Sequence, residues 1–290
     1  MSRREAALEE ALKLREASQA PASGAPAGKT EGEQHSLHRF VAPEKRLVDP
    51  SAVNRHVVSL AEPHSPASEQ YKKIRARLLK GTAKGFLNTI MVTSPGMGEG
   101  KTVTAINLAV SMAEELDHTV LLVDADLRKP SVHEYLGFAP KCGLSEYLKG
   151  EASLSDTLIR TGVGKLVVLP AGNPPENPSE LISSERMRTL VREMKLRYKD
   201  RYVIFDTSPL LVTADPLSLG SYVDGTVLLI QAARTSSKAA VQAASLLKDF
   251  NLLGVIFNNV PEHLAGDFYS YHHRYKEQGY IKNYLYGKQP

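Results

Sequence analysis

The 290-residue chain contains a single cysteine, Cys142, and no apolar run near the roughly 18 residues that a membrane-spanning helix needs. One thiol excludes an internal disulfide and any metal site built from several cysteines, and it favours a reducing compartment. The first residues, MSRREAALEE, also lack the apolar stretch of a signal peptide. These absences predict a cytoplasmic protein.

No charge of one sign dominates the sequence. Lysine and arginine number 36 against 32 aspartate and glutamate, and both signs are spread along the chain. The net charge of +4 permits weak attraction to nucleic acid or anionic lipid, so charge alone does not decide the partner. We expect no nucleic-acid partner. Apolar residues make up 42% of the chain, which suits one sizeable globular domain with appendages.

Composition divides the chain into three segments. In residues 1–35, apolar and charged residues recur at helical spacing before a Pro- and Gly-containing stretch, which predicts an amphipathic helix and a flexible linker. That helix either docks on a partner or is a solvated terminal helix. Residues 36–262 form the globular domain. Residues 263–290 are rich in tyrosine and include six of the twelve in the chain: Tyr269, Tyr271, Tyr275, Tyr280, Tyr284 and Tyr286.

The globular domain shows a repeating strand–helix pattern. Near-continuously apolar runs predict buried parallel strands, and the helical patterns between them predict helices on both faces of the sheet. The fold class is therefore α/β, with a doubly wound, mostly parallel sheet. Asn177, Pro178 and Glu180 add an N-cap, an N1 proline and a capping-box acid for one helix. The strand-like runs are residues 87–94, 119–125, 165–171, 202–207, 225–231 and 253–260, and helical patterns cover 68–80, 103–116, 186–196 and 238–250.

The segment TSPGMGEGKTV lies between a predicted strand and a predicted helix, the context that a phosphate-binding loop requires. Its glycines let the backbone amides turn inward toward an anion. Lys101 would neutralise β- and γ-phosphate oxygens, and the Thr102 hydroxyl would bind Mg²⁺. Pro95 replaces the usual first glycine, so we expect Gly96 to make the turn. The expected nucleotide-binding residues are Gly96, Met97, Gly98, Glu99, Gly100, Lys101, Thr102 and Val103.

Acidic residues follow two further strands, where α/β sheets present their ligand sites. Asp124 and Asp126 end the run LLVDAD, with Arg128 close by, and Asp206 ends the run VIFDT. Together with the Thr102 hydroxyl, the carboxylates of Asp124 and Asp206 predict a metal site. Asn258, at the end of the last strand, either hydrogen-bonds an adenine edge or forms a turn.

These motifs resemble those of the bacterial tyrosine kinases, or BY-kinases, a P-loop NTPase family, from about Glu69 to the C-terminus. The matching segments are the SPGMGEGKT phosphate loop, the LLVDADLR second Walker motif, the VIFDTSP Walker B motif and the tyrosine-rich tail. The family also has an ExxRxxR helix that mediates ring-shaped oligomers. Here Glu69, Lys72 and Arg75 occupy those positions, and Lys72 lacks the planar fork of arginine.

The resemblance implies a protein-tyrosine kinase that uses ATP and Mg²⁺ to phosphorylate its own tail. Catalysis would rest on Lys101, Asp124, Asp126, Arg128 and Asp206, with Asp124 or Asp126 orienting the phenol and taking its proton late. The N-terminal helix and the lack of a fused membrane domain resemble free-standing kinases of exosortase-linked polysaccharide export. Such kinases are recruited to the inner face of the membrane by a chain-length-determinant-type activator. A phosphotyrosine phosphatase and other protein substrates are further implied partners.

Two other functions share this fold. A deviant-Walker positioning or partitioning ATPase would carry a lysine at the position of Gly96, and it would have no reason for six clustered tyrosines. A scaffold that binds ATP without turning it over would not need Lys101, Thr102 and the three aspartates intact. Phosphotyrosine formed with ATP and Mg²⁺ distinguishes the kinase from both.

Overall fold

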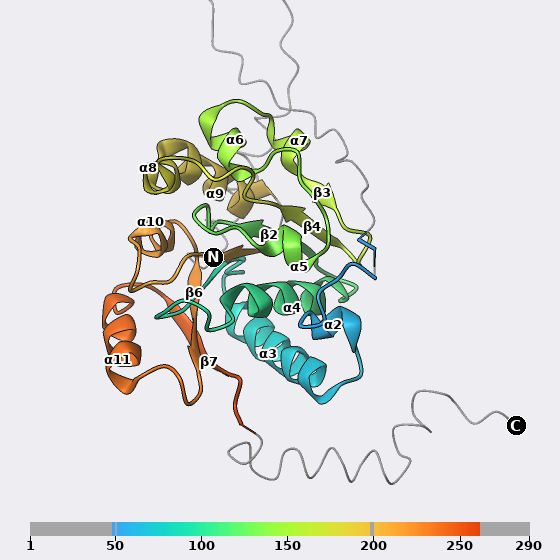
Figure 1. Ribbon diagram of the computed structural model, residues 1–290, viewed down its shortest axis with the longest axis vertical. Helices are drawn as coiled ribbons and strands as arrows, with labels where there is room; N and C mark the ends of the chain where they lie inside the picture. Colours follow the sequence, from blue (N-terminus) through green and yellow to red (C-terminus); the bar gives the residue numbers. More distant parts are fainter. Residues whose placement is uncertain (1–47, 50, 198–199, 262–290) are drawn as a thin grey trace, which may run out of the picture. The chain divides into compact units, whose positions relative to one another are not determined.

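The computed structural model describes residues 48–49, 51–197 and 200–261. The predicted N-terminal helix and linker, and the tyrosine-rich tail with its six candidate acceptors, lie outside these residues. The described residues form the predicted α/β domain (Figure 1).

Seven strands form one sheet in the described part of the chain, in the order β3-β4-β2-β5-β1-β6-β7. Every neighbouring pair is parallel except β3 and β4. This topology confirms the doubly wound, mostly parallel sheet. Strand β3 was not predicted, because two residues are too few to show an alternating pattern. The strands are β1 (Thr89–Thr93), β2 (Thr119–Asp124), β3 (Ile159–Arg160), β4 (Leu166–Leu169), β5 (Arg201–Asp206), β6 (Gly225–Gln231) and β7 (Leu252–Asn258).

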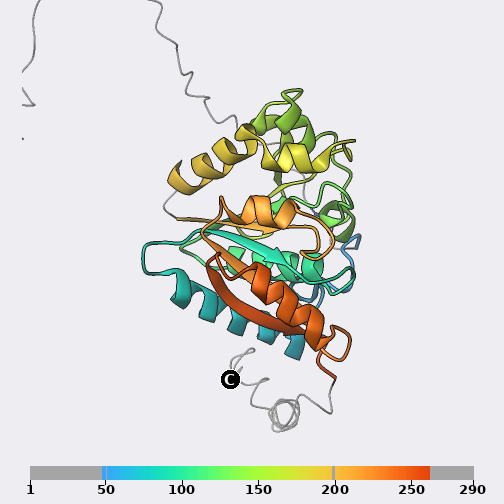
Figure 2. The same cartoon turned by 90° about the vertical axis from the view of Figure 1, so that its left-hand side faces the viewer.

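Helices cover both faces of the sheet (Figures 1 and 2). One face packs against α2 (Val58–Ala61), α3 (Pro66–Thr82), α4 (Lys101–Ala113) and α5 (Val132–Tyr135). The opposite face packs against α6 (Leu144–Lys149), α8 (Pro178–Ser183), α9 (Glu185–Arg197) and α10 (Asp215–Gly220), with α7 (Leu154–Thr157) beside them. On that side α11 (Ser237–Leu246) packs on β6. None of the helices that the structure describes is long and apolar enough to cross a membrane.

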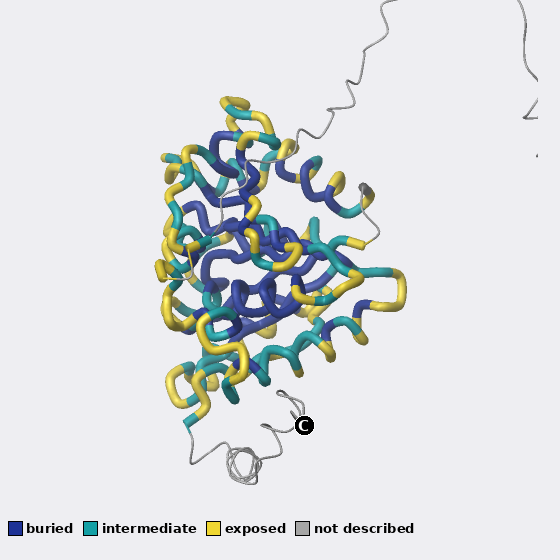
Figure 3. The backbone as a smooth tube through the Cα atoms, turned by 90° about the vertical axis from the view of Figure 1, so that its right-hand side faces the viewer, coloured by how far each residue is buried: buried dark blue, intermediate teal, exposed yellow. Residues whose placement is uncertain are grey.

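The central strands are apolar on both faces because each face is covered by helices. Along β1, Ile90 and Val92 pack in the cluster that contains α4, whereas Met91 packs on the other side with α9. All five residues of β1 are buried, and Figure 3 shows the interior strands as the buried centre of the domain. A sheet fixed in this way holds the carboxyl ends of its strands rigidly.

Strand register brings the predicted acids together. Val92 and Asp124 both pair with Asp206 across the β1–β5 and β2–β5 ladders. The residues that follow β1, β2 and β5 therefore meet at one edge of the sheet, as expected for ligand sites in parallel sheets.

The N-termini of two helices, α3 and α8, differ in part from their predictions. Helix α3 begins at Pro66, two residues before the predicted start, because the Ser65 hydroxyl accepts the Ser68 amide at 3.1 Å and caps it. Helix α8 has Asn177 and Pro178 in the predicted positions, but the Asn177 side chain makes no cap hydrogen bond. The predicted side-chain cap at Asn177 is therefore wrong.

Candidate active site

The phosphate-binding loop connects β1 to α4. Gly98 and Gly100 have φ values of 72° and 95°, the left-handed region that favours glycine. The chain bends at residues 95 and 96, as expected, but Gly96 makes this bend without entering the left-handed region. Helix α4 begins at Lys101 with no side-chain cap, which leaves its N-terminal amides available to an anion.

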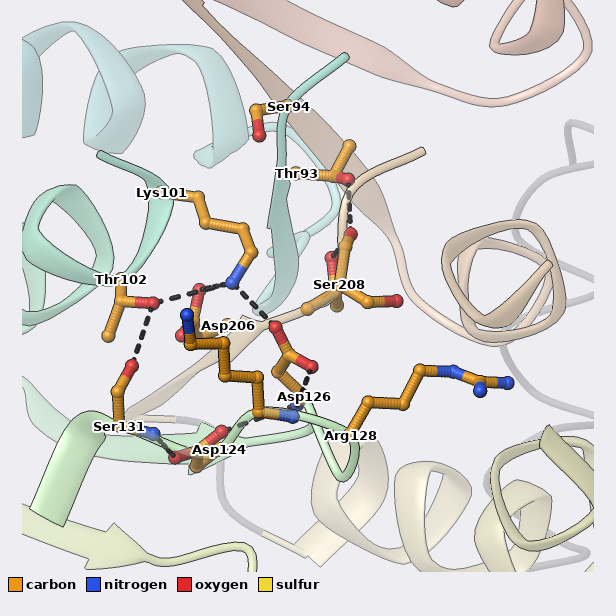
Figure 4. Close-up of polar contacts among 12 residues, drawn as sticks. Thr93, Ser94, Lys101, Thr102, Asp124, Asp126, Arg128, Ser131, Asp206 and Ser208 are labelled. Carbon is orange, nitrogen blue, oxygen red and sulfur yellow. Dashed lines mark hydrogen bonds and ion pairs between the residues drawn. The ribbon is translucent and has the colours of Figure 1, made fainter. Parts of the chain in front are cut away.

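Lys101 lies at the centre of a cluster of polar side chains (Figure 4). Its Nζ atom is 2.7 Å from Asp126 Oδ2, 3.9 Å from Asp206 Oδ1 and 3.4 Å from the Thr102 hydroxyl. Burial lowers the pKa of Lys101, but the negative charges of Asp206 and Asp126 raise it more, so its pKa lies above the ordinary value. The ammonium therefore keeps its proton, as a phosphate-binding lysine must.

Asp124 anchors the loop that follows β2. Its Oδ2 atom accepts the amides of Ser131 and Val132, both at 3.1 Å, and its Oδ1 atom accepts the amide of Asp126 at 3.3 Å. Complete burial and the nearby charge of Asp206 raise the pKa of Asp124 to about 8. Because both carboxylate oxygens hold backbone amides, Asp124 shapes the loop that presents Asp126.

Asp206 differs from Asp124 because neither of its buried oxygens has a hydrogen-bond partner of good geometry among the described residues. Burial raises its pKa to about 6, against the effects of the Lys101 charge and the nearby Thr102 hydroxyl. A buried carboxylate that accepts no hydrogen bond is costly unless a ligand supplies the missing contacts, even with the Lys101 ammonium 3.9 Å away. Mg²⁺ prefers oxygen ligands and keeps several waters, so Thr102 and Asp206 fit this cation. Among the described residues, no three or more His, Cys, Asp or Glu side chains form a group that could hold a metal ion.

Arg128 does not reach the Lys101 cluster. Its Nε atom lies 2.9 Å from Asp215 Oδ2, one of its terminal nitrogens donates to Ser179 Oγ at 2.7 Å, and Figure 4 shows its side chain extending away from Lys101. These bonds tie the loop after β2 to α8 and α10. Arg128 nevertheless lines the same cavity as Lys101 and Asp126, so its role at the phosphates stays a prediction.

Asn258 lies at the end of β7, as predicted, and contacts the phosphate loop. Its side-chain amide donates to the Glu99 carbonyl at 2.9 Å. A side chain at Gly100 would collide with that amide, which explains the glycine there. Asn258 therefore supports the loop backbone, and its amide nitrogen is already engaged.

Two residues that the sequence did not predict for the site, Thr235 and Arg234, hydrogen-bond the phosphate loop. Thr235 donates its hydroxyl proton to Glu99 Oε1 at 2.7 Å, and Arg234 donates to the Gly98 carbonyl at 3.2 Å. The signal available in the sequence was their position just after a predicted strand. Partners 136 residues away could not be assigned from that position.

A cavity of ≈ 550 Å³ opens above these side chains. Its floor includes Lys101, Thr102 and Asp126, whereas Asp124 and Asp206 do not line it. The other lining residues come from the phosphate loop, from the loops after β2 and β5, and from α5 and the segment before α2. The cavity can therefore admit a phosphorylated ligand and a second reactant at the same edge of the sheet.

The predicted ring-contact residues are bonded within the chain. Lys72 Nζ lies 2.6 Å from Glu69 and 3.2 Å from the Pro63 carbonyl. Arg75 donates to the Ser111 carbonyl of α4 at 2.7 Å and pairs with Glu115, just beyond the end of that helix, at 2.9 Å. A ring contact through Arg75 would have to share or replace these bonds.

The parallel sheet, the glycine-lined loop and the lysine at the start of α4 define a P-loop nucleotide-binding domain. The chain matches the family described as the CobQ/CobB/MinD/ParA nucleotide binding domain over residues 90–279.

Similarity to individual proteins narrows the family further. The tyrosine-protein kinase YwqD of Bacillus subtilis (strain 168) is 39% identical over 210 residues, which cover 72% of this chain and 87% of that protein. The kinase domain of Escherichia coli tyrosine kinase ETK has a TM-score of 0.67 at 30% identity, over 71% of this chain and 80% of that chain. The chain belongs to the bacterial tyrosine kinases.

The alternative of a positioning ATPase receives only distant support. The septum site-determining protein MinD from Pyrococcus horikoshii OT3, solved with Mg-ADP, has a TM-score of 0.51 at 22% identity, over 62% of this chain and 76% of that chain. That likeness shows a shared fold alone.

Proposed function

We propose that this tyrosine kinase transfers the γ-phosphate of ATP to tyrosines of its own tail and thereby regulates exopolysaccharide synthesis or export. The observation that carries the proposal is the pairing of Lys101 with Asp126 on the floor of one cavity. A phosphate-binding cation and a carboxylate that can accept a phenol proton are the two groups that transfer to tyrosine needs.

ATP binding would change the partner of Lys101. The loop amides and the N-terminus of α4 would hold the phosphates, and the β- and γ-oxygens would draw the ammonium away from Asp126. The Oδ2 atom of Asp126 is then free to accept a hydrogen bond from an arriving phenol, while Oδ1 still accepts the Lys129 amide at 3.1 Å. The same ion pair thus keeps the carboxylate occupied until nucleotide is present.

Asp126 is a better candidate than Asp124 for the contact with the phenol. Asp126 lines the cavity, whereas the oxygens of Asp124 hold three backbone amides. A phenol has a pKa near 10 and an ordinary aspartate near 4, so full deprotonation before transfer is unfavourable. Asp126 would therefore orient the phenol and take its proton late, as the new oxygen–phosphorus bond forms and the bond from the γ-phosphorus to the departing ADP oxygen breaks.

Mg²⁺ fits beside Thr102 and Asp206. When bound, the cation neutralises charge on the β- and γ-phosphates. Thr102 would contribute its hydroxyl, and Asp206 would orient the waters of the cation through its oxygens, which accept no hydrogen bond from the described residues. Asp124 would act indirectly, because its oxygens fix the loop that follows β2.

The tail can reach a reaction centre. From Val260, Tyr269 lies within at most about 30 Å and Tyr286 within about 90 Å, at roughly 3.5 Å per residue. Either the chain's own site or that of a neighbour is within this distance. Each phosphate adds about −1.5 to −2 charges to a tail that is mildly basic before reaction. We expect this reversal to loosen oligomers or change partner contacts.

The proposal includes partners. A membrane protein of the chain-length-determinant type would activate the kinase and hold it at the inner face of the cell membrane. A homo-oligomer, in ring form through Glu69, Lys72 and Arg75, would present tails to neighbouring sites. Other tyrosine-containing proteins would serve as substrates, and a phosphotyrosine phosphatase would reverse the reaction.

Intact-mass and phosphosite analysis tests the proposal. The full chain is incubated with ATP and Mg²⁺, alone and with a membrane activator, beside a Lys101→Met variant and a variant with all six tail tyrosines changed to phenylalanine. We expect phosphate on residues 269–286 in the wild type only. Nucleotide uptake without a labelled tail tyrosine, even with the activator, would contradict the proposal.

A further inference from the structure

Two loops are joined side by side at the mouth of the cavity. The loop after β5 donates the Leu210 amide to the Ser94 carbonyl at 2.8 Å and the Leu211 amide to the Pro95 carbonyl at 3.2 Å. The Thr93 hydroxyl donates to the Ser208 carbonyl at 3.0 Å. These bonds fix the segment that carries Val212 alongside the start of the phosphate loop.

Val212 is fixed further by its own turn. Its amide and that of Thr213 both donate to the Pro209 carbonyl, at 3.1 and 3.2 Å. The Thr213 hydroxyl lies 2.5 Å from that of Ser208. The backbone around Val212 is therefore tightly bonded, and the position of its Cα atom is set before any ligand arrives.

Both loops expose a large apolar side chain on the cavity. Met97 is 60% exposed and Val212 is 57% exposed, and both line the cavity whose floor holds Lys101 and Asp126. The other large, strongly exposed apolar residues in the described ranges, such as Val241 and Phe257, lie away from this cavity. An apolar rim, which we define as Met97, Pro209 and Val212, thus stands over a charged floor.

We propose that this apolar rim is the acceptor subsite, and that it binds the aromatic ring of a tail tyrosine while the hydroxyl reaches Asp126. The inference rests on the proposed function. A tyrosine side chain has an apolar body and a polar tip, which matches an apolar rim over a polar floor. Methionine sulfur also makes favourable contacts with aromatic rings. Serine and threonine have no ring for such a rim, so it selects tyrosine as the acceptor.

The position of the rim favours a tyrosine over other occupants. It is continuous with the floor that would hold the γ-phosphate, so a ring placed there brings its hydroxyl toward the reacting atoms. The chain that leaves the domain after Pro261 carries six tyrosines, within the reach given above. A nucleotide base or a second copy of the domain on this rim are the alternative outcomes of the test.

The test uses the full chain with its six tail tyrosines changed to serine, so that the acceptor is supplied only as a synthetic peptide of residues 263–290. Val212→Ser is compared with Val241→Ser, the same change at a residue 67% exposed on α11. We expect Val212→Ser to raise KM for the peptide about 3–10-fold, with KM for ATP and kcat within about twofold. Val212→Ile, which stays apolar, should retain the parent value.

Binding of a fluorescent peptide in the presence of MgADP gives a second measurement that needs no turnover. Weakening by Val212→Ser but not by Val241→Ser supports the subsite. Equal peptide binding and KM in both variants would overturn it, as would a change confined to KM for ATP or to self-association. If the parent chain itself neither phosphorylates nor binds the peptide, the proposed function fails first, so the two failures are distinguishable.

Discussion

The side-chain amide of Asn258 donates a hydrogen bond to the carbonyl of Glu99 at 2.9 Å and ties the end of β7 to the middle of the phosphate loop. The two residues are 159 positions apart in the sequence. The phosphate loop is therefore held by a strand that does not itself line the cavity.

Removal of this tie should weaken nucleotide binding. Asn258→Ala should lower ATP affinity about 3–10-fold and stability by about 1 kcal/mol, since one hydrogen bond to the loop is lost. Isothermal titration with ATP and Mg²⁺, with denaturant unfolding alongside, measures both. Asn251→Ala is the matched control, because that amide donates to the Asp224 carbonyl at 2.7 Å just before the start of β7. It should lose similar stability and no ATP affinity; equal affinity loss in both variants would contradict the role of Asn258.

Gly100 should not tolerate a side chain. Its φ of 95° is strained for any L-residue, and a Cβ atom would collide with the Asn258 amide. We expect Gly100→Ala to cost about 1–2 kcal/mol of stability and to lower ATP affinity at least about tenfold. Gly254→Ala in β7, where nothing lies within 4 Å of the added atom, serves as the control. Normal ATP binding by Gly100→Ala would argue against this loop geometry.

Arg128 should matter more for stability than for transfer. Asp215 is nearly fully buried, so Arg128→Ala leaves a carboxylate without its cation and should cost about 1–3 kcal/mol. Arg188→Ala, which breaks an exposed pair with Glu185, should cost less than about 1 kcal/mol. Transfer to the tail should fall at least about 100-fold in Lys101→Met and far less in Arg128→Ala. Equal losses of transfer would place Arg128 at the phosphates during the reaction.

Asp224 should make stability depend on acid pH. Its Oδ2 atom accepts the Thr89 hydroxyl at 2.7 Å and the amides of Asn88 and Thr89, and Oδ1 pairs with Lys195 at 2.9 Å. Partial burial raises the pKa of Asp224, but the bonds from Thr89 and Lys195 outweigh it, so the pKa lies below its ordinary value.

A depressed folded-state pKa stabilises the fold above the unfolded value, near 3.9, and this contribution is lost as pH falls through the folded value. Asp224→Ala should cost about 1–3 kcal/mol at pH 7, and the gap to wild type should shrink below about pH 4. Urea unfolding from pH 7 to pH 3 measures it, with the exposed Asp249→Ala as control. A gap that stays constant with pH would refute the assignment.

The local sequence pattern was sufficient to predict the sheet and the phosphate loop. The apolar runs predicted six of the strands, and the glycines with Lys101 and Thr102 predicted the phosphate loop, because both features depend on residues adjacent in the sequence. Three positions were not predictable in this way. Arg128 pairs with Asp215 87 residues later, Thr235 bonds Glu99 from 136 residues away, and Asn258 depends on the same loop. Such pairings follow from tertiary packing, which a single sequence does not state.

The attachment of β7 to the phosphate loop has a kinetic consequence. The sequence reaches the tyrosine-rich tail only a few residues beyond the strand end that touches the loop, so each proposed acceptor is covalently linked to its own reaction centre. A covalent link gives an effective concentration of the order of millimolar where its length suits the span. Encounter within one molecule would then be insensitive to dilution, whereas encounter between molecules would slow in proportion, and a dilution series separates the two routes.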